Sequence, residues 1–292
     1  MKYAFIQQHC VMFHVRALCY VLQVSKSGYY AWLHRRTTQR EQENKRLLQL
    51  VQAGCTESHY TYGVRRLTAY VRNQGIVANH KRIARLKALH GIYPNTRKPQ
   101  NIKTTVVHRN HPVENNHLNR QFMNNHPNQV WVGDITYLKT LQGWVYLAVW
   151  LDLCSRKIVG WSIQQHLQTS LVLQAFDRAC IHEAVMPHMV HTDRGCQYTS
   201  TDFRHKLMSN HVSLSMSRRG NCWDNAVCER FFGTLKTEWT NRFCYRNQEE
   251  ARSSVFEYIE VFYNRKRLHS SIEYKTPIQY QERAKNREMR VH

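Results

Sequence analysis

Three apolar segments separated by short turns, between residues 129 and 163, constrain the fold of this chain most. They read WVGDITYLK, VYLAVWLDL and IVGWSI, and the turns between them are LQGW and SRK. Turns this short join neighbouring strands that run antiparallel. The middle segment is apolar throughout, as expected of a strand that is covered on both faces. The sequence therefore predicts a central sheet with other layers packed against it.

Helices and strands are expected to alternate after the third strand. The predicted elements are a helix at about Thr169–Glu183, a strand at Met189–Asp193, a helix at about 200–210, a short strand VSLSMS, and helices within Asn221–Glu238 and 249–263. This order predicts an α/β fold, with a mixed sheet of three antiparallel strands followed by two parallel ones and helices on its faces. We assign the domain to residues 129–283 and a tail to residues 284–292.

The first 93 residues predict an all-helical region with two helix-turn-helix candidates, at residues 11–33 and 62–92. The first candidate is equally compatible with a purely structural three-helix bundle. In the second, Gly75 ends one helix and Asn79 can cap the next. The basic residues expected on the outer face of that last helix are Lys81, Arg82, Arg85 and Lys87. Such a face favours contact with phosphate groups of a nucleic acid.

The charge of the chain favours a polyanionic partner. There are 42 Lys and Arg against 20 Asp and Glu, a net charge of +22, and residues 1–128 hold 20 of the basic residues but only 4 of the acidic ones. Nucleic acid is a better match than a membrane, because no long basic amphipathic helix stands out. Residues 94–128 are rich in Asn, His, Pro and Lys with little periodicity, which predicts a basic linker or an extended arm along a nucleic-acid backbone.

Cysteine usage and hydropathy indicate a protein of the reducing cytoplasm. The nine cysteines form no CxxC pair, and no signal peptide is recognised. The longest apolar run, Val145–Leu153, is too short to span a bilayer. A zinc site is not expected, because the spacing of His9, Cys10, His14 and Cys19 matches no Cys/His zinc pattern.

Three acidic residues on separate elements are the candidates for catalysis. Asp134 lies inside the first strand, Asp193 ends the fourth at the edge where α/β sheets place ligands, and Glu229 lies on an amphipathic helix. An isolated carboxylate in an apolar strand is costly unless it is paired, protonated or bound to metal. If the three converge, they suit a hard ion such as Mg²⁺. The alternative is three unrelated acids, with Asp134 paired to Arg156.

The helix of Glu229 predicts a place for the substrate as well. Lys236 lies two turns beyond Glu229 and near the same azimuth, so that its ammonium can hold a phosphate beside the carboxylate. Asp224 is expected to cap the start of the helix. The core-facing stripe is expected to be Val227, Phe231, Leu235 and Trp239. Taken alone, the segment is equally typical of a capped surface helix with solvated charges.

Several polar residues near these elements have two interpretations. Asp152 falls opposite Trp131 in the inferred hairpin, which favours a structural role, and His191 is expected to be a hydrogen-bonded core residue. Asn225 is expected to orient Glu229 or to contact DNA. Arg267, with Tyr263, Asn264 and His269, is expected at a polar helix end near DNA, with a structural cap as the equal alternative.

The motifs together resemble a known family. WVGDITY, HTDRGCQY and DNAVCERFFGTLKTE occur in this order, with 58 residues between Asp134 and Asp193, 35 between Asp193 and Glu229, and Lys236 seven residues further on. The pattern is similar to the Asp-Asp-Glu integrase core of bacterial insertion-sequence transposases, specifically the second-reading-frame (OrfB) protein of the IS-three family. The similarity extends to SKSGYYAWL, YGVRRL and the closing YNRKRLHSSIEYKTPIQY.

The resemblance implies a ribonuclease H-like fold and a reaction on DNA. Asp134, Asp193 and Glu229 would bind two Mg²⁺ ions, which Mn²⁺ can replace. Water would nick a strand at the end of the insertion element, and the freed 3′-hydroxyl would attack another phosphodiester. The implied partners are the terminal inverted repeats, target DNA and at least a second copy of the chain.

The chain also departs from the family pattern. Arg230 follows Glu229 where Ser is usual, and HTDRGCQY replaces HSDRGSQY, but neither change removes an acidic residue. The helix-turn-helix and leucine zipper of the family's frameshift fusion are not recognised, which implies an upstream-frame (OrfA) partner or a fusion. The sequence thus predicts a metal-dependent DNA transposase. The alternatives are a plain nuclease of the same fold and a catalytically silent DNA-binding partner of a longer transposase.

Overall fold

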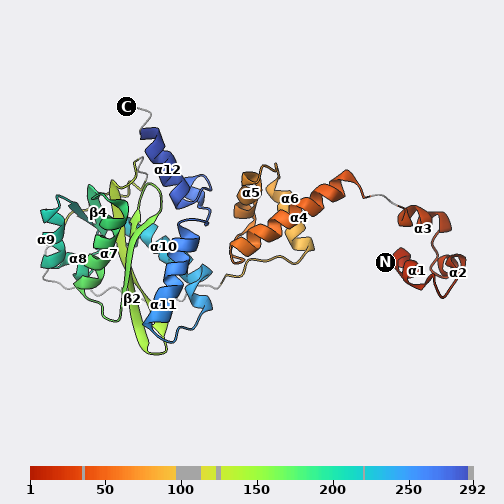
Figure 1. Cartoon of the computed structure of the whole chain (residues 1–292), viewed down its shortest axis with the longest axis horizontal. Coiled ribbons are helices and arrows are strands. Elements are labelled where there is room, and N and C mark those ends of the chain that lie inside the picture. Colours follow the sequence, from red (N-terminus) through yellow and green to blue (C-terminus); the bar gives the residue numbers. More distant parts are fainter. Residues whose placement is uncertain (35–36, 97–112, 123–125, 220, 289–292) are drawn as a thin grey trace. The chain divides into compact units, whose positions relative to one another are not determined.

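The computed structural model describes residues 1–34, 37–96, 113–122, 126–219 and 221–288 (Figure 1). The chain divides into two compact units, Met1–Leu50 and Val51–His292, and helix α4 (Gln39–Glu57) runs across the boundary between them. Much of the predicted linker at 94–128, and the last four residues of the tail, lie outside the described residues. In the parts of the chain that the structure covers, no helix is long and apolar enough to cross a membrane.

The N-terminal unit contains three short helices before α4, and these include the first helix-turn-helix candidate. They are α1 (Lys2–His9), α2 (Val15–Val21) and α3 (Lys26–Leu33). Ile6, Cys19 and Tyr29, one from each helix, form its buried core. The Ser25 side chain caps α3 by accepting a hydrogen bond from the Gly28 N–H, 2.9 Å away.

The second helix-turn-helix candidate forms the pair α5 (Val64–Asn73) and α6 (His80–Leu89). Gly75 has a φ of +80°, a conformation that other residues rarely adopt, and it terminates α5. The Asn79 side chain caps α6 through the Lys81 N–H, as predicted. The prediction of an exposed Lys87 is wrong, because the side chain is buried and its amine donates to the Tyr62 carbonyl.

The five-stranded sheet has the order β3-β2-β1-β4-β5. Its strands are β1 (Val130–Thr140), β2 (Gly143–Asp152), β3 (Ile158–Gln164), β4 (Met189–Thr192) and β5 (Ser213–Met216). The first three are antiparallel neighbours, β4 is parallel to β1, and β5 is parallel to β4. This confirms the predicted mixed sheet of three antiparallel strands followed by two parallel ones.

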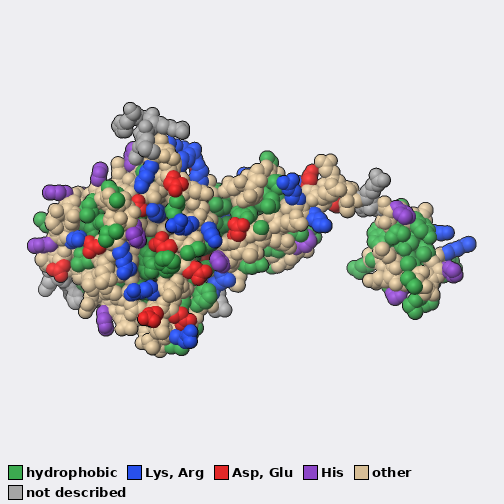
Figure 2. Space-filling model, in the orientation of Figure 1, with side chains coloured by type: hydrophobic (Ala, Val, Ile, Leu, Met, Phe, Trp, Pro, Cys, Tyr) green, Lys and Arg blue, Asp and Glu red, His purple; other side chains and the backbone are tan. Residues whose placement is uncertain are grey.

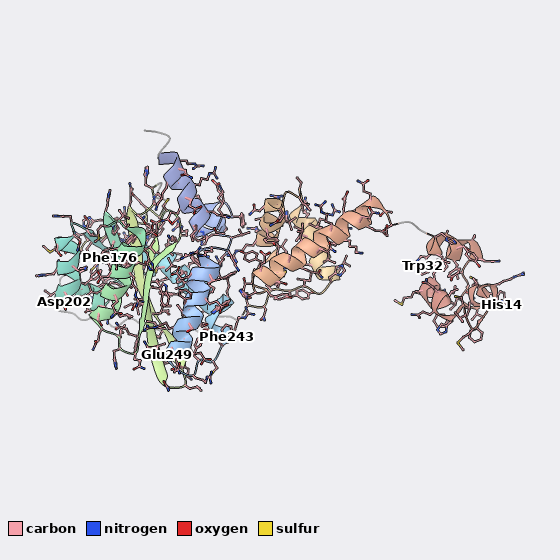
Figure 3. The ribbon with its side chains drawn as sticks, viewed as in Figure 1. His14, Trp32, Phe176, Asp202, Phe243 and Glu249 are labelled. Atoms are coloured by element: carbon pink, nitrogen blue, oxygen red, sulfur yellow. The ribbon has the colours of Figure 1, made fainter. Side chains whose placement is uncertain are left out.

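Helices cover the sheet on both sides, as Figure 1 shows. On one side lie α7 (Thr169–Glu183), α8 (Cys196–Thr199) and α9 (Thr201–Ser209), and on the other lie α10 (Ala226–Glu238), α11 (Gln248–Phe256) and α12 (Pro277–Glu288). Phe176 of α7, labelled in Figure 3, packs against Trp131 and Trp150 in the main core. A Cβ at Gly160 would overlap the Ala175 carbonyl, so this glycine allows α7 to approach β3 closely.

The predicted helix at 249–263 is α11 followed by a π-helical segment, Glu257–Tyr263. Tyr258, Ile259, Phe262 and Tyr263 of this segment are buried, and Asn264 directly after it is 1% exposed. The Asn264 side chain accepts a hydrogen bond from the Ile158 N–H and donates one to the Ile158 carbonyl, both at 3.0 Å. These bonds fix the segment to the end of β3.

Candidate active site

The two candidate aspartates stand at the same level on neighbouring parallel strands. Val132 of β1 pairs with His191 of β4 in the parallel ladder. Asp134 and Asp193 each lie two residues beyond this pair, and side chains two residues apart share a face of the sheet. Both side chains are partly buried. The strand register therefore places Asp134 on β1, and Asp193 directly after β4, near the same edge of the sheet.

Backbone hydrogen bonds hold both aspartate side chains. The Ile135 N–H donates to Oδ1 of Asp134 at 2.8 Å, and the Gly195 N–H donates to Oδ1 of Asp193 at 3.0 Å. A Cβ at Gly195 would stand only 3.0 Å from that same carboxylate oxygen. Glycine at this position therefore leaves room for the Asp193 carboxylate to approach the backbone.

Glu229 lies in the first turn of α10, and its side chain is exposed. The Asn225 side chain, just before this helix, donates to the Gly133 carbonyl at 3.2 Å. That bond fixes the start of α10 to β1 immediately beside Asp134. Asn225 is expected either to orient Glu229 or to contact DNA. Its side chain is buried and bonded to β1, which favours the first of these roles.

The pKa shifts indicate that the three carboxylates lie in one electrostatic field. Burial raises the pKa of Asp134 well above its usual value, the charges of Asp193 and Glu229 raise it further, and the Lys236 charge opposes them. Burial likewise raises the pKa of Asp193. Although the Glu229 side chain is exposed, partial desolvation of its carboxylate by the surrounding protein raises its pKa, and the charge of Asp193 raises it further. Carboxylates that repel one another in this way are stabilised by a bound cation.

Lys236 of α10 faces the same site. Burial lowers the pKa of its ammonium group, and the negative charge of Asp134 acts in the opposite direction. The amine lies 6.0 Å from the centre of the Tyr137 ring, on β1. The ammonium group therefore lies near the Tyr137 ring and within electrostatic range of Asp134.

The donor chemistry of the site suits a hydrated divalent cation. Within the described ranges, no three His, Cys, Asp or Glu side chains are already gathered closely enough to hold a metal ion. Among the described residues, the buried polar atoms that have no hydrogen-bond partner include the Tyr198 hydroxyl, which lies in the electrostatic field of Asp134 and Asp193, and the Asn225 side-chain oxygen, just before α10. Water ligands of Mg²⁺ could satisfy both atoms, since they donate and accept hydrogen bonds, while the carboxylates supply hard oxygen ligands. The residues therefore fit the expected ion.

Replacing Tyr198 by phenylalanine should separate this metal environment from ordinary packing. The Tyr198 side chain is 1% exposed, and an unpaired buried hydroxyl costs about 1–3 kcal/mol. The melting temperature of the metal-free variant should therefore equal or exceed that of the parent. The rise in melting temperature on adding Mg²⁺ should be smaller in Tyr198→Phe, because water ligands lose a partner.

Tyr245→Phe is the matched control for this experiment. The Tyr245 hydroxyl bonds to the Ser254 hydroxyl at 3.0 Å, so its removal should cost about 1 kcal/mol. This variant should respond to Mg²⁺ as the parent does. Destabilisation of metal-free Tyr198→Phe, or an unchanged Mg²⁺ response, would show that the Tyr198 hydroxyl has a structural partner instead.

Asp224 does not cap α10, contrary to the prediction. It lies inside a 3₁₀ turn, Cys222–Asn225, that precedes the helix, and its carboxylate is fully buried. It accepts hydrogen bonds from the side chains of Arg218, Arg120 and Asn116. Hydrogen bonds from Arg218 lower the pKa of Asp224, although burial opposes them. Asp224 therefore anchors the approach to α10, and two of its partners are more than 100 residues away in sequence.

The other acids and bases near the site have structural partners. Asp152 pairs opposite Trp131, as predicted, and is fully buried, accepting hydrogen bonds from Asn128 and Ser155. His191 is fully buried between the Ser215 and Ser217 hydroxyls, 2.9 and 3.1 Å from its ring nitrogens. Arg156 donates to the Phe122 carbonyl and not to Asp134.

The basic residues predicted to contact DNA differ in their exposure to solvent. On α6, Lys81 and Arg85 are exposed and Arg82 is partly exposed. Arg267, by contrast, is 2% exposed and donates two hydrogen bonds of 2.7 Å to the Glu238 carboxylate. Its guanidinium is therefore part of the interior, so the structural alternative describes it and we exclude it from the proposed DNA contacts.

Comparison with known protein families identifies the class to which this chain belongs. Models of the integrase core domain match residues 124–222 and 210–277, and a model of an HTH-like domain matches residues 41–100. Together with the mixed sheet and its flanking helices, these matches define an integrase-core protein with a helix-turn-helix-like domain in front.

Two curated relatives narrow the class to a family. The chain is 41% identical over 276 residues to the transposase InsF for insertion sequence IS3A of Escherichia coli (strain K12), covering 92% of this chain and 94% of the relative. It is 40% identical over 250 residues to the transposase for insertion sequence element IS904 of Lactococcus lactis subsp. lactis (strain IL1403), covering 84% and 97%. The chain belongs to the IS3 family of insertion-sequence transposases. Its integrase core makes it a polynucleotidyl transferase.

Solved structures with a related fold come from retroviruses. The catalytic core domain of HTLV-2 integrase in complex with magnesium (trimeric form) has a TM-score of 0.43 and 21% identity, covering 53% of this chain and 97% of that one. The simian T-cell lymphotropic virus intasome in complex with PP2A regulatory subunit B56 gamma has a TM-score of 0.48 and 19% identity, covering 75% and 70%.

Proposed function

We propose that Asp134, Asp193 and Glu229 are the catalytic residues of this transposase and that they bind Mg²⁺, two ions in the active state, for which Mn²⁺ can substitute. The observation that carries the proposal is the register of β1 and β4. It sets the two aspartates level on adjacent strands, and Glu229 shares their electrostatic field. Bound Mg²⁺ would supply charge stabilisation for oxygens that attack and leave a phosphorus centre.

The protein's own groups orient the acids and hold the substrate. The Ile135 and Gly195 N–H groups fix one oxygen of each aspartate, which leaves the other oxygen free to act as a ligand. The Asn225–Gly133 hydrogen bond holds the start of α10, and thus Glu229, beside β1. Lys236 contacts the phosphate of the strand to be cut, since its ammonium group lies in the field of Asp134.

Helix α6 contributes DNA contacts outside the active site. Lys81, Arg82 and Arg85 contact backbone phosphates, which positions the DNA without reading its sequence. Support comes from the exposure of Lys81 and Arg85 on the helix that follows the turn of the HTH-like domain. The substrates are the terminal inverted repeats of the insertion element and its target DNA, in the bacterial cytoplasm.

The reaction is a pair of displacements at phosphorus. Water cuts one strand at the end of the insertion element, and the 3′-hydroxyl thus freed attacks a second phosphodiester. Because both ends of the insertion element must be processed together, at least two copies of the chain act on DNA. An upstream-frame protein, or a fusion to it, brings the chain to its own ends.

Cleavage and joining of the insertion element's own terminal DNA tests this proposal. Duplex oligonucleotides bearing the terminal repeat are incubated with the protein and Mg²⁺, and products are separated on denaturing gels. Nicked strands together with longer joined strands are expected. Nicks without joined strands would indicate a plain nuclease. Binding without cleavage, in Mg²⁺ and in Mn²⁺, would indicate a catalytically silent DNA-binding partner.

A further inference from the structure

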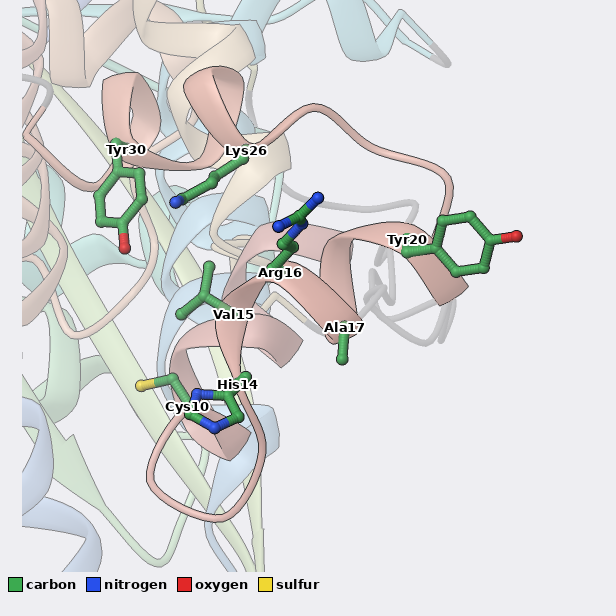
Figure 4. Close-up of a pocket in the computed structure, with 8 residues that line it drawn as sticks. All are labelled: Cys10, His14, Val15, Arg16, Ala17, Tyr20, Lys26 and Tyr30. Carbon is green, nitrogen blue, oxygen red and sulfur yellow. The ribbon is translucent and has the colours of Figure 1, made fainter.

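A cavity of about 730 Å³, open to solvent, lies on the surface of the N-terminal unit between α2, α3 and the connection that precedes α2. The residues that line the cavity all precede the HTH-like match, which begins at residue 41, and the integrase-core matches, so neither the family models nor the proposed active site assigns them a role. The residues that line the cavity are Cys10, His14, Val15, Arg16, Ala17, Tyr20, Lys26 and Tyr30 (Figure 4).

The walls of the cavity combine cations with aromatic rings. Helix α2 contributes Arg16 and, one turn later, Tyr20, and helix α3 contributes Lys26 and, one turn later, Tyr30. Figure 4 shows the Lys26 amine directed toward Tyr30, and the two are 6.0 Å apart from nitrogen to ring centre. Both rings are accessible, with Tyr30 40% exposed and Tyr20 85% exposed.

The charge around the cavity is of one sign. No Asp or Glu occurs before Glu41, so the N-terminal unit up to the end of α3 contains no carboxylate side chain that could neutralise Arg16 or Lys26. Figure 2 shows the same unit with Lys, Arg and His on its visible face and no acidic side chain. A concave surface of this kind attracts an anion, and histidine at position 14 adds a further donor.

The fold of the unit fixes the two helices that carry the cations, and the Arg16 and Lys26 side chains project from them into solvent. Cys19 and Tyr29 pack with Ile6 in its core, and each belongs to the helix that carries one of the cations. The Lys2 amine donates to the Leu22 carbonyl at the end of α2. The cavity walls are therefore held by buried contacts rather than by flexible chain.

We propose that this cavity is a DNA-backbone site, separate from α6 and from the active site. Arg16 and Lys26 bind one or two adjacent phosphates, and Tyr30 packs against the neighbouring sugar or base. The proposal rests on the proposed function in that the DNA is a substrate of the transposase. It gives the chain a further point of contact with DNA, ahead of the HTH-like domain.

The test is the salt dependence of DNA binding by the full-length chain. Arg16→Gln/Lys26→Gln is compared with the parent on a duplex carrying the terminal repeat, and on the same strand alone, by fluorescence anisotropy from 50 to 300 mM salt. The slope of log K against log salt should decrease by about 2 for two lost phosphate contacts, with affinity falling roughly tenfold. Arg16→Lys/Lys26→Arg should keep the parent slope.

A charge-matched variant controls for general electrostatics. Arg246→Gln/Lys285→Gln removes the same charge from two accessible side chains of the other unit, and its slope should equal that of the parent. The proposal would be overturned if both double variants lost the same DNA affinity and salt slope, or if Arg16→Gln/Lys26→Gln lost neither. If Arg16→Gln/Lys26→Gln changes the molecular mass of the protein in solution but leaves its DNA affinity unchanged, the cavity binds a protein partner and the proposal is overturned. Cleavage by the parent, measured separately, tests the proposed function alone.

Discussion

Glu229→Gln should reduce the rate of DNA strand cleavage about a thousandfold while leaving the protein folded. The substitution removes one negative charge from the expected ion site, and a loss of about 4 kcal/mol of transition-state stabilisation corresponds to that factor. The Glu229 side chain is exposed and is repelled by Asp193, so the fold should not depend on its charge. The melting temperature of the metal-free variant should equal or slightly exceed that of the parent.

The measurement is single-turnover cleavage of a terminal-repeat duplex in Mg²⁺, with thermal unfolding of the same samples. Asp202→Asn is the matched control, because Asp202 is an exposed acid on α9 at the outer edge of the domain (Figure 3). It should cleave at the parent rate. Cleavage by Glu229→Gln at more than a tenth of the parent rate would mean that this carboxylate does not serve the reaction.

Asp193→Asn should show the same loss of cleavage, but with a different effect on stability. Burial raises the pKa of Asp193, so removing its charge relieves an unfavourable state of the metal-free protein. The variant should therefore be at least as stable as the parent in the absence of metal. The two acids thus make a paired test, in which activity falls while stability does not.

The sheet could be predicted from the sequence because its signals are local. The turns LQGW and SRK and the apolar segments around them define β1, β2 and β3 without reference to distant residues. The positions of Asp134 and Asp193 in the sheet also follow from local signals, because each lies in or directly after a recognisable strand. Parallel strands end at the same edge of a sheet. The hydrogen-bonding capacity of the Asn79 side chain likewise predicted the cap of α6.

The residues that were misjudged have partners far away in the sequence. Asp224 is an acceptable helix cap by local rules, but Arg120, 104 residues earlier, draws its carboxylate into a buried cluster. Lys87 occupies an outward position by helical period, but its amine reaches the Tyr62 carbonyl, 25 residues earlier. Arg267 sits in a basic segment, RKR, and is buried only because Glu238 of another helix faces it. Local patterns carry no information about such pairs.

Arg267 belongs to a buried ionic cluster that connects α10 with α5. Glu238, the last residue of α10, accepts two hydrogen bonds of 2.7 Å from Arg267, one of 3.2 Å from Arg66 and one of 3.3 Å from the Tyr258 hydroxyl. Arg66 belongs to α5, and the Tyr62 hydroxyl just before that helix accepts from the Leu268 N–H at 2.6 Å. Glu229 and Glu238 lie on the same helix, so this cluster fixes the far end of the helix that carries a candidate catalytic acid.

Charge neutralisation at the centre of this cluster should destabilise the protein strongly. Burial alone would raise the pKa of Glu238, but the charge and hydrogen bonds of Arg267, followed by the charge of Arg66, lower it overall. Glu238→Gln leaves the Arg267 guanidinium, 2% exposed, without its counter-ion and facing a second cation. Breaking a buried pair in this way costs about 3–5 kcal/mol.

Denaturant unfolding of Glu238→Gln at neutral pH should therefore show a much smaller free energy of unfolding than the parent. Glu250→Gln is the control, since Glu250 forms a pair with the 81% exposed Arg246 four residues earlier, worth at most about 0.5 kcal/mol. Because the folded pKa of Glu238 is lowered, its contribution is complete above the unfolded pKa of about 4.3 and is lost as the pH falls through the folded value. The gap between parent and Glu238→Gln should accordingly narrow below about pH 4. Equal stability of the two proteins at neutral pH would mean that desolvation of the three charged groups cancels their attraction, and that α10 is held by its apolar contacts alone.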